Sequence, residues 1–432
     1  MSAPAQVSTA LTVVAVPVSR RHRYVTGTAF VVVGLACALL LGFGSKAGVD
    51  ATFKVSAPGG YFSIPNITLP ARAVAFVVGG VVVVLGVLQI TTGLSRRAMR
   101  WALVFTLGGV VFAFLCWAST GQQSTIDVLG LLQQTIFLAV PLILGALGGI
   151  LCERSGVVNV AIEGQMLSGA FAGALVGTLF HNNAIGIVGA MAAGGLIGVL
   201  LAVFAIKYLV NQVILGVVLN VFALGLTGFV YDALMAPAAD TYNNPTPMSA
   251  VAIPVLSRIP FFGPLLFDQN WIVYLTYILI VAVQLALFRT RWGLRTRAVG
   301  EHPEAAETVG IRVRATRYRN VITAGFVAGL AGAYLTLGTV GAFSKNISSG
   351  KGFIALAAVI FGRWSPLGAL GAALLFGFAD ALQTVLSFIG TPVAIPSSFL
   401  AMLPYLATLF AVAGLVGRVR APAADGVPYE GR

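Results

Sequence analysis

The sequence RTRWGLRTRAVGEHPEAAETVGIRVRATRYR, residues 289–319, lies between two long apolar segments and decides how the chain is arranged. Arginines stand on both sides of a short acidic turn within it: Arg289, Arg291, Arg295, Arg297, Arg312, Arg314, Arg317 and Arg319. A basic excess between two membrane spans marks a cytoplasmic loop under the positive-inside rule. The stretch therefore predicts a helical membrane protein with this loop on the cytoplasmic side.

The acidic part of the loop carries the signals of a short helix. Pro303 suits the first helical position, His302 can cap it, and Gly310 suits a left-handed stop. Glu304 and Glu307 would lie near the positive N-terminal end, where carboxylates are favoured. We expect a helix of about two turns over residues 303–309.

This helix has a small apolar surface, which consists of Ala305, Ala306, Val309 and Ile311. At this position lipid cannot cover such a surface. We therefore expect the helix to dock into another protein. The alternative is an ordinary basic loop that only fixes the orientation of the chain.

The composition excludes a soluble globular protein, since 58% of the residues are hydrophobic and 9% are charged. The apolar residues occur in runs of about twenty, which suits helices that cross a bilayer and not the short alternating strands of an outer-membrane barrel. The net charge is +13, and the arginines that produce it lie in loops between spans. We therefore interpret the charge as a signal of membrane topology, and we expect no nucleic-acid partner. Cys37, Cys116 and Cys152 have no metal-ligand spacing, and we expect them to be buried, reduced and structural.

Residues 1–125 are expected to form an N-terminal extension with about three transmembrane helices, near 25–44, 73–94 and 101–119. Residues 1–19 are small and polar and are expected to be disordered. The apolar run that follows is too long for a signal peptide and lacks an obvious cleavage site, so it predicts an anchor with its N-terminus inside.

From Ile126 onward the composition shifts towards glycine. Gly145 and Gly149, and then Gly169, Gly173 and Gly177, recur every fourth residue, a spacing that lets helices approach closely in lipid. Two glycine-rich spans are expected here, one that ends near Leu151 and one that follows it. Further spans are expected near 184–206, 213–235, 270–288, 320–340, 367–388 and 399–416. The fold class is an all-α polytopic membrane protein with about ten to twelve transmembrane helices.

The apolar segment 353–361 is too short to cross the membrane. We expect a half-helix that is buried in protein, as irregular backbone at membrane depth requires. The exact number of spans around residues 353–366 stays open at this stage.

The densest polar cluster in an apolar setting is LCERSGVVNVAIEGQM, residues 151–166. One interpretation is a plain cytoplasmic turn with Glu153 and Arg154 in solvent. The other is a broken helix whose Asn159 and Glu163 line the substrate path. The residues alone do not decide between them.

Four further polar side chains fall within the expected spans: Asn220, Asp232, Asp380 and Gln383. A charged or amide side chain inside a membrane is costly and is a functional candidate by default. Helix–helix hydrogen bonding is the alternative, especially for Asn220 and Gln383. Asp380 has no basic partner nearby in sequence, which favours a role in the substrate path.

Several separated motifs resemble the branched-chain amino acid/simple-sugar permease family of ABC transporters, and in particular its nucleoside-importer branch. They are PLILGALGGILCERSGVVNVAIEGQM, RAVGEHPEAAETVGI, GFVAGLAGAYL, GFIALAAVIFGRWSPLGALGAALLFGFADALQ and MLPYLATL, in this order. The resemblance covers about residues 126–416, which places the permease core at 126–417 and a cytoplasmic tail at 418–432. The EAA…G pattern of Glu304, Ala305, Ala306 and Gly310 resembles the loop that meets the ATPase in such permeases, although the downstream Leu-Pro part is missing.

The resemblance implies an importer subunit in the plasma membrane of a prokaryote. The basic residues before the first span and Arg418 and Arg420 after the last one predict that both termini lie in the cytoplasm. The implied partners are a cytoplasmic ABC ATPase, a second homologous permease and an extracytoplasmic substrate-binding protein. The implied substrate is a nucleoside, with a simple sugar such as ribose as the alternative. The residues implied for ATPase coupling are Pro303, Glu304, Ala305, Ala306, Val309 and Gly310.

The chain has no Gly-x4-Gly-Lys-Ser/Thr loop, nucleophile elbow or His-Glu-x-x-His pair, so we expect no catalytic residues, metal or cofactor in it. His22, His181 and His302 stand at the ends of expected spans and are assigned no chemistry. A secondary transporter powered by an ion gradient remains the competing class. It would not need a capped helix in the 289–319 loop.

Overall fold

The computed structural model describes residues 20–46, 48–56, 65–121, 125–389, 391–393, 395–400, 402–403, 406 and 420–431. Within these residues, nine helices are long and apolar enough to cross a membrane, and strands are few and short. The expected all-α polytopic fold is confirmed. Residues 1–19 and most of the span expected near 399–416 lie outside the described residues.

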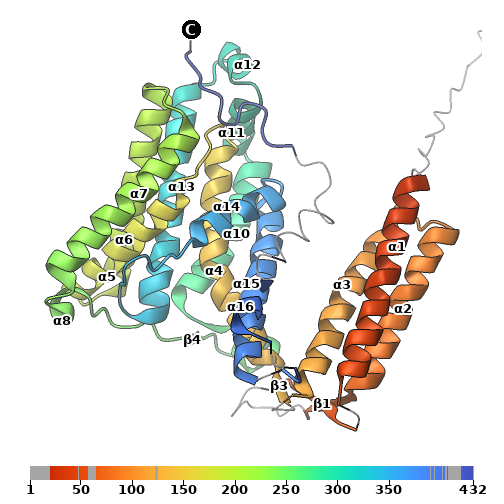
Figure 1. Ribbon diagram of the computed structural model, residues 1–432. Coiled ribbons are helices and arrows are strands. Elements are labelled where there is room, and N and C mark those ends of the chain that lie inside the picture. The colour runs from red at the N-terminus through yellow and green to blue at the C-terminus, as the bar shows by residue number, and fades with distance from the viewer. Residues whose placement is uncertain are drawn as a thin grey trace, which may run out of the picture. The chain divides into compact units, whose positions relative to one another are not determined.

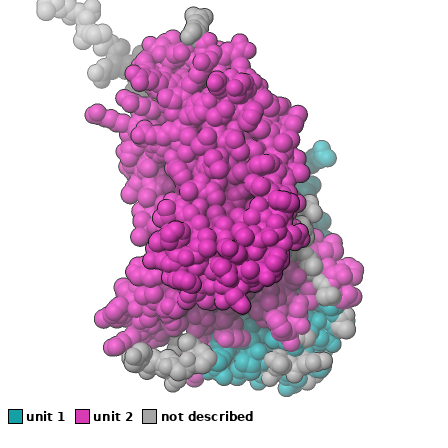
Figure 2. Space-filling view, turned by 90° about the vertical axis from the view of Figure 1, so that its left-hand side faces the viewer, with its two compact units in different colours: residues 1–54, 66–126, 389–395 teal, residues 55–65, 127–388, 396–432 magenta. Residues whose placement is uncertain are grey.

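The chain divides into two compact units, which Figure 2 shows in different colours. Unit 1 comprises residues 1–54, 66–126 and 389–395, and unit 2 comprises residues 55–65, 127–388 and 396–432. Each unit is described by itself below.

Unit 1 is a bundle of three long helices with a small sheet at one end (Figure 1). Its helices are α1 (Arg20–Ala36), continued by the π-helical turn η1 (Cys37–Gly42), α2 (Ala71–Thr91) and α3 (Arg96–Ser119). Its strands pair in the order β2-β1-β3 and are β1 (Asp50–Lys54), β2 (Ile67–Pro70) and β3 (Thr125–Asp127). The three helices begin and end close to the three spans expected for residues 1–125.

Helices α1 and α2 pack closely because glycines face each other. A Cβ atom on Gly34 would lie 2.7 Å from the carbonyl oxygen of Gly79, and a Cβ atom on Gly79 would lie 2.7 Å from that of Gly34. Only glycine permits this distance, and small residues at helix contacts are what membrane bundles use in place of a hydrophobic driving force. Substitution of either glycine would push the two helices apart.

Unit 2 contains the remaining long helices and a half-helix (Figure 1). Its long helices are α4 (Val128–Glu153), α5 (Ile162–Leu179), α6 (Asn183–Ala202), α7 (Gln212–Val230), α10 (Trp271–Arg289), α13 (Val313–Leu335) and α15 (Pro366–Ile389). Its shorter helices are α8 (Ala239–Tyr242), α9 (Phe262–Leu266), α11 (Arg291–Glu301), α12 (Pro303–Thr308), α14 (Lys351–Phe361) and α16 (Ser397–Leu400). Its other elements are the π-helical turns η2 (Val203–Lys207), η3 (Tyr231–Met235) and η5 (Thr336–Val340), the 3-10 turn η4 (Leu256–Arg258), and the strands β4 (Val251–Ala252) and β5 (Asp268–Gln269).

Asparagine side chains set where three of these helices begin. The side chain of Asn182 accepts a hydrogen bond from the Ala184 N–H at the start of α6. At the starts of α7 and α10, the side chains of Asn211 and Asn270 likewise accept from backbone N–H groups of the first turn. Each cap accepts a hydrogen bond from an N–H group of the first turn, and such groups have no acceptor within the helix. The caps fix the helix ends that the apolar runs alone leave undefined.

Helix α13 lies at the centre of unit 2 and packs against α4, α5 and α6. Gly169 of α5 and Gly194 of α6 both contact the backbone of Gly329 on α13, and a side chain on any of them would clash. Gly145 and Gly149 of α4 likewise contact Ala355 and Val359 of α14. The expected close approach at the repeated glycines is confirmed.

Helix α14 is an apolar helix of 11 residues, in agreement with the expected half-helix. Its residues Ala355, Ala358 and Val359 are buried in the core of unit 2. Helices α11 and α12 lie at one end of unit 2, and α8 lies at the opposite end (Figure 1). The described C-terminal residues are at the same end as α12.

Candidate functional site

The carboxylate of Glu163 holds the start of the half-helix α14. Its Oε1 accepts from Ser348 Oγ at 2.6 Å and from the Gly350 N–H at 2.8 Å, and its Oε2 accepts from the Gly352 N–H at 2.6 Å. The N-terminal N–H groups of a helix have no partner within it and carry partial positive charge, so a carboxylate there is strongly favoured. Glu163 is only 7% exposed, and its acceptor capacity is used within the protein.

Asn159 and Asn220 are also engaged by neighbouring protein groups. The amide nitrogen of Asn159 donates to Gln165 Oε1 at 3.1 Å. Asn220 accepts from the Gly164 N–H at 2.8 Å and donates to the Val160 carbonyl at 2.9 Å, so α7 supports the irregular backbone before α5. This arrangement matches the helix–helix hydrogen bonding that we weighed for Asn220.

Glu153 and Arg154, at the end of α4, hold the turn between α14 and α15. Trp364 Nε1 donates to Glu153 Oε2 at 2.5 Å, and Arg154 Nε donates to the Trp364 carbonyl at 2.9 Å. In this turn Arg363 has φ 56° and Trp364 has φ 52°, a left-handed conformation that is costly for residues with a side chain. The interpretation of Glu153 as a solvated residue is wrong, because its side chain is buried.

Asp380 and Gln383 lie one turn apart on α15 and are half-buried. In the described part of the chain neither side chain has a hydrogen-bond partner, although the charge of Lys351 on α14 acts on Asp380. In this they differ from Glu163 and Asn220, whose side chains are hydrogen-bonded to described groups. Asp232, the other acidic residue that we considered, forms an ion pair of 2.6 Å with Lys345 at an exposed site.

The loop at residues 289–319 contains two helices. Helix α12 begins at Pro303 as expected, and Gly310 has the expected left-handed backbone with φ 82°. His302 forms no side-chain cap, so that expectation is wrong. Helix α11 was not expected; Thr290 begins it by accepting from the Gly293 N–H at 3.2 Å.

The apolar surface of α12 is divided between two faces. Ala305 is exposed and Val309 is 75% exposed, but Ala306 is only 3% exposed and packs within unit 2. The expectation that all four apolar side chains form one docking surface is therefore wrong for Ala306. On a helix with 3.6 residues per turn, adjacent residues point in different directions, and here position 306 points inward.

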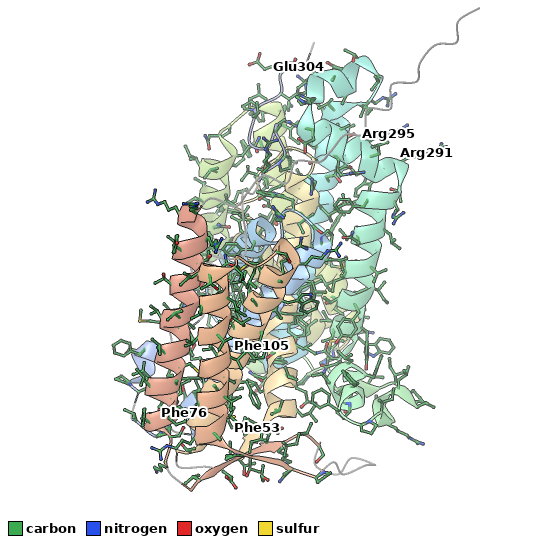
Figure 3. The ribbon with its side chains drawn as sticks, turned by 90° about the vertical axis from the view of Figure 1, so that its right-hand side faces the viewer. Phe53, Phe76, Phe105, Arg291, Arg295 and Glu304 are labelled. Carbon is green, nitrogen blue, oxygen red and sulfur yellow. The ribbon has the colours of Figure 1, made fainter. Side chains whose placement is uncertain are left out.

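A groove of about 500 Å³ lies beside α12 and is basic. Its lining residues are Trp292, Arg295, Gly310, Ile311, Arg312, Ala315, Thr316 and Arg319. No acidic residue lines it, and within the described residues none of its arginines forms an ion pair. Figure 3 shows Arg291 and Arg295 on α11 and Glu304 at the tip of the loop. The groove is suited to acidic side chains of a partner.

The sequence did not predict the hydrogen-bond partners of the Glu163 and Glu153 carboxylates. Ser348, Gly352 and Trp364 are 185, 189 and 211 positions away from the carboxylates they contact. A signal existed for Ser348 and Gly352, because the SSGKG sequence of residues 348–352, at the start of α14, has the small residues that a helix start with irregular backbone needs. The cysteines are as expected: Cys37, Cys116 and Cys152 are buried and free.

A glycine-packed bundle of apolar helices, with a half-helix in its core and a helical loop at one end, is the architecture of a multi-pass membrane protein. The chain belongs to the family of branched-chain amino acid transport system permease components, whose sequence profile matches residues 131–415.

The chain is similar to several transport permeases. The chain is 43% identical to the guanosine ABC transporter permease protein NupQ of Bacillus subtilis over 306 aligned residues. The alignment covers 68% of this chain and 94% of the relative. It is 38% identical to the nucleoside ABC transporter permease protein NupC of Lactococcus lactis, over 67% of this chain and 93% of the relative. It is 36% identical to the putative glucose ABC transporter permease protein TsgC13 of Haloferax volcanii, over 59% of this chain and 77% of the relative. No solved structure matches the chain.

Proposed function

We propose that this chain is the membrane-spanning subunit of an ATP-driven importer of nucleosides. The observation that carries the proposal is the loop of α11 and α12, which presents Ala305 and Val309 beside a basic groove. An exposed apolar tip, flanked by arginines that form no ion pair with a described residue, fits the surface of a partner protein. Membership of this permease family, with relatives named as ABC transporter permeases, supports an ABC ATPase as the partner over an ion-coupled transporter.

The proposal assigns a side of the membrane to each end of unit 2. The arginine-rich end with α11 and α12 faces the cytoplasm under the positive-inside rule, and both chain termini are cytoplasmic. The opposite end, with α8, faces outward and receives substrate from an extracytoplasmic binding protein. A second homologous permease completes the pathway in the plasma membrane of a prokaryote. Residues 1–125 are an added extension to a core at 126–417.

Within the core, we assign Asp380 and Gln383 to the substrate path, because their side chains are not used by the described protein groups. Carboxylate and amide groups can bind ribose hydroxyls or the edge of a base. The role that we assign to Asn159, Glu163 and Asn220 is structural: their hydrogen bonds hold the backbone around α5 and α14.

The substrate is assigned from the relatives named for guanosine and nucleosides. A simple sugar such as ribose is the second candidate, which the relative named for glucose supports. Uptake of labelled guanosine, uridine, adenosine and ribose by cells with and without this chain separates the two. Loss of ribose uptake with intact nucleoside uptake would reverse the assignment.

Copurification tests the ATPase partner. We expect detergent extracts to contain this chain together with an ABC ATPase, and the purified chain alone to hydrolyse no ATP. ATP hydrolysis by the chain on its own, or a stable transporter without an ATPase subunit, would contradict the proposal.

A further inference from the structure

The segment Arg420–Gly431, here called the tail segment, returns to the loop that carries α11 and α12. The Ala424 N–H donates to the carbonyl of Gly300 at 2.9 Å, and the Ala423 N–H donates to Glu301 Oε2 at 3.2 Å. Gly300 and Glu301 are the last two residues of α11, immediately before α12. The tail segment therefore supplies donors to carbonyl and carboxylate groups at the end of that helix.

The same segment is bound by α13. Arg317 is 2% exposed and donates through Nη1 to the carbonyl of Val427 at 3.1 Å. Its guanidinium also lies 5.8 Å from the centre of the Tyr429 ring, and Arg314 donates to the carbonyl of Glu430. A buried cation is costly unless protein groups replace its water. For Arg317, the described hydrogen-bond acceptor and the ring over the guanidinium both belong to the tail segment, while its Nε and Nη2 have no described hydrogen-bond partner.

Apolar packing joins the tail segment to α12 itself. Tyr429 is 7% exposed and forms a buried cluster with Val299, Ala306 and Val313. A helix of six residues such as α12 is too short to be stable without tertiary contacts. Three members of the cluster come from α11, α12 and α13, and the tail segment supplies the fourth, which is the largest.

The tail segment also contacts the turn between α4 and α5. A Cβ atom on Gly156 would lie 3.0 Å from the Ala424 carbonyl oxygen and 2.8 Å from Arg317 Nη2, and Gly156 has φ 88°. The segment is thus in contact with α11, α12, α13 and the end of α4 at once. A displacement of α12 must be transmitted to these elements or must break their contacts with the tail segment.

We propose that the tail segment positions α12 for the ATPase, and that Tyr429 is the positioning residue through which it does so. This inference rests on the proposed function of α12. Without Tyr429, Ala306 loses the partner that fixes the orientation of its helix, so movement of the ATPase would be transmitted less completely to α13.

The first experiment measures whether the tail segment is docked in the full-length chain. A nitroxide label on the variant Val427→Cys reports local mobility, since Val427 is exposed and the described native cysteines are buried. In this background we expect an immobile label, which becomes mobile with Tyr429→Ala and stays immobile with Tyr429→Phe, because phenylalanine keeps the ring. Glu430→Ala is the matched control, as only its backbone carbonyl is bonded.

The second experiment measures coupling in vesicles that contain this chain, its partner permease and the ATPase, supplied with the binding protein. We expect Tyr429→Ala to lower the number of substrate molecules imported per ATP by about tenfold, within the range found for mutations that alter coupling between sites. Tyr429→Phe and Glu430→Ala should match the unmodified protein.

Two results would overturn the inference. One is a label that stays immobile in Tyr429→Ala, and the other is a mobile label with normal import per ATP. Failure of the unmodified chain to bind any ATPase would instead overturn the proposed function, and with it the coupling role. The label mobility would still show separately whether the segment docks.

Discussion

The indole N–H of Trp364 donates to the carboxylate of Glu153 over 2.5 Å, and this bond joins the end of α4 to the turn that follows α14. Both residues are buried, and the backbone of Trp364 is left-handed. The contact therefore holds a turn that would otherwise relax. It gives the first prediction.

Glu153→Leu should destabilise the protein by about 1–3 kcal/mol, because it leaves the buried indole N–H without an acceptor. Thermal unfolding of the purified chain in detergent measures this. Trp364→Phe in the same background should restore part of the loss by removing the unsatisfied donor. Equal unfolding temperatures for Glu153→Leu and the parent chain would contradict the assignment.

Glu163→Gln should weaken the start of α14, since an amide can accept only through its oxygen and three donors converge on the carboxylate. We expect a loss of about 1–3 kcal/mol in unfolding free energy. Ser348→Ala removes one donor and should cost less. If Glu163→Gln lowers uptake with no change in stability, Glu163 contacts substrate and does not serve as a helix cap.

Asp380→Asn should lower the initial rate of uptake by about tenfold or more, because hydrogen bonds to a charged group contribute about 1.5–3 kcal/mol. Its thermal stability should not fall, since no described group bonds to the carboxylate. Ser387→Ala is the matched control on α15, where the hydroxyl is bonded to the carbonyl of Gln383. Normal uptake by Asp380→Asn would remove this residue from the substrate path.

Ala305→Glu should weaken binding of the ATPase without unfolding α12, because Ala305 is exposed. Gly310→Val should do so by a different route, since a side chain in the left-handed region costs about 1–2 kcal/mol and redirects the chain after α12. ATPase retained on immobilised permease is the measurement, together with ATP hydrolysis in vesicles. Full retention in both variants would mean that the loop only orients the chain.

Docking of the tail segment should depend on pH through Asp425. Burial, and then the nearby Glu153 carboxylate, raise the pKa of Asp425 to about 8, while Arg317 opposes this rise. Cys152 of α4 also faces the group. A carboxyl group whose pKa is higher when docked binds more protons in the docked state, so docking weakens as pH rises from about 4 towards 8 and changes little above that.

The nitroxide label on Val427→Cys measures this, and its mobile fraction should increase between pH 6 and 8.5. Asp425→Asn should remove most of the dependence, because the amide does not titrate. A mobile fraction that is independent of pH in the parent chain would show that Asp425 is not buried as a neutral acid.

Local signals in the sequence were sufficient for part of this fold. Pro303 and Gly310 mark the ends of α12, the short apolar run before Gly362 predicts α14, and the repeated glycines predict close helix contacts. Helix α11 was missed because its arginines indicate a loop by charge, while its N-cap, Thr290, is a single weak signal.

The contacts between distant segments could not be predicted. Ser348 lies 185 positions from Glu163, and no periodicity within either segment indicates that they meet. An acidic residue inside a membrane is interpreted first as a functional group. Only the geometry shows that Glu163 is a helix cap, while Asp380, similar in sequence terms, accepts no hydrogen bond from a described residue through its carboxylate. The tail segment was expected simply as a cytoplasmic end, since nothing local marks Tyr429 as buried.

The cap at Glu163 has a consequence for how access could alternate between the two sides of the membrane. Three hydrogen bonds to one carboxylate tie α14 to α5, while Gly145 and Gly149 seat the same half-helix against α4. To slide α14 past α5 would mean breaking charge-assisted bonds to a buried carboxylate, and to slide it past α4 would mean losing the close packing at these two glycines. These three helices should therefore travel as one rigid body, and the surfaces that shear during a transport cycle must lie around that body, not through it.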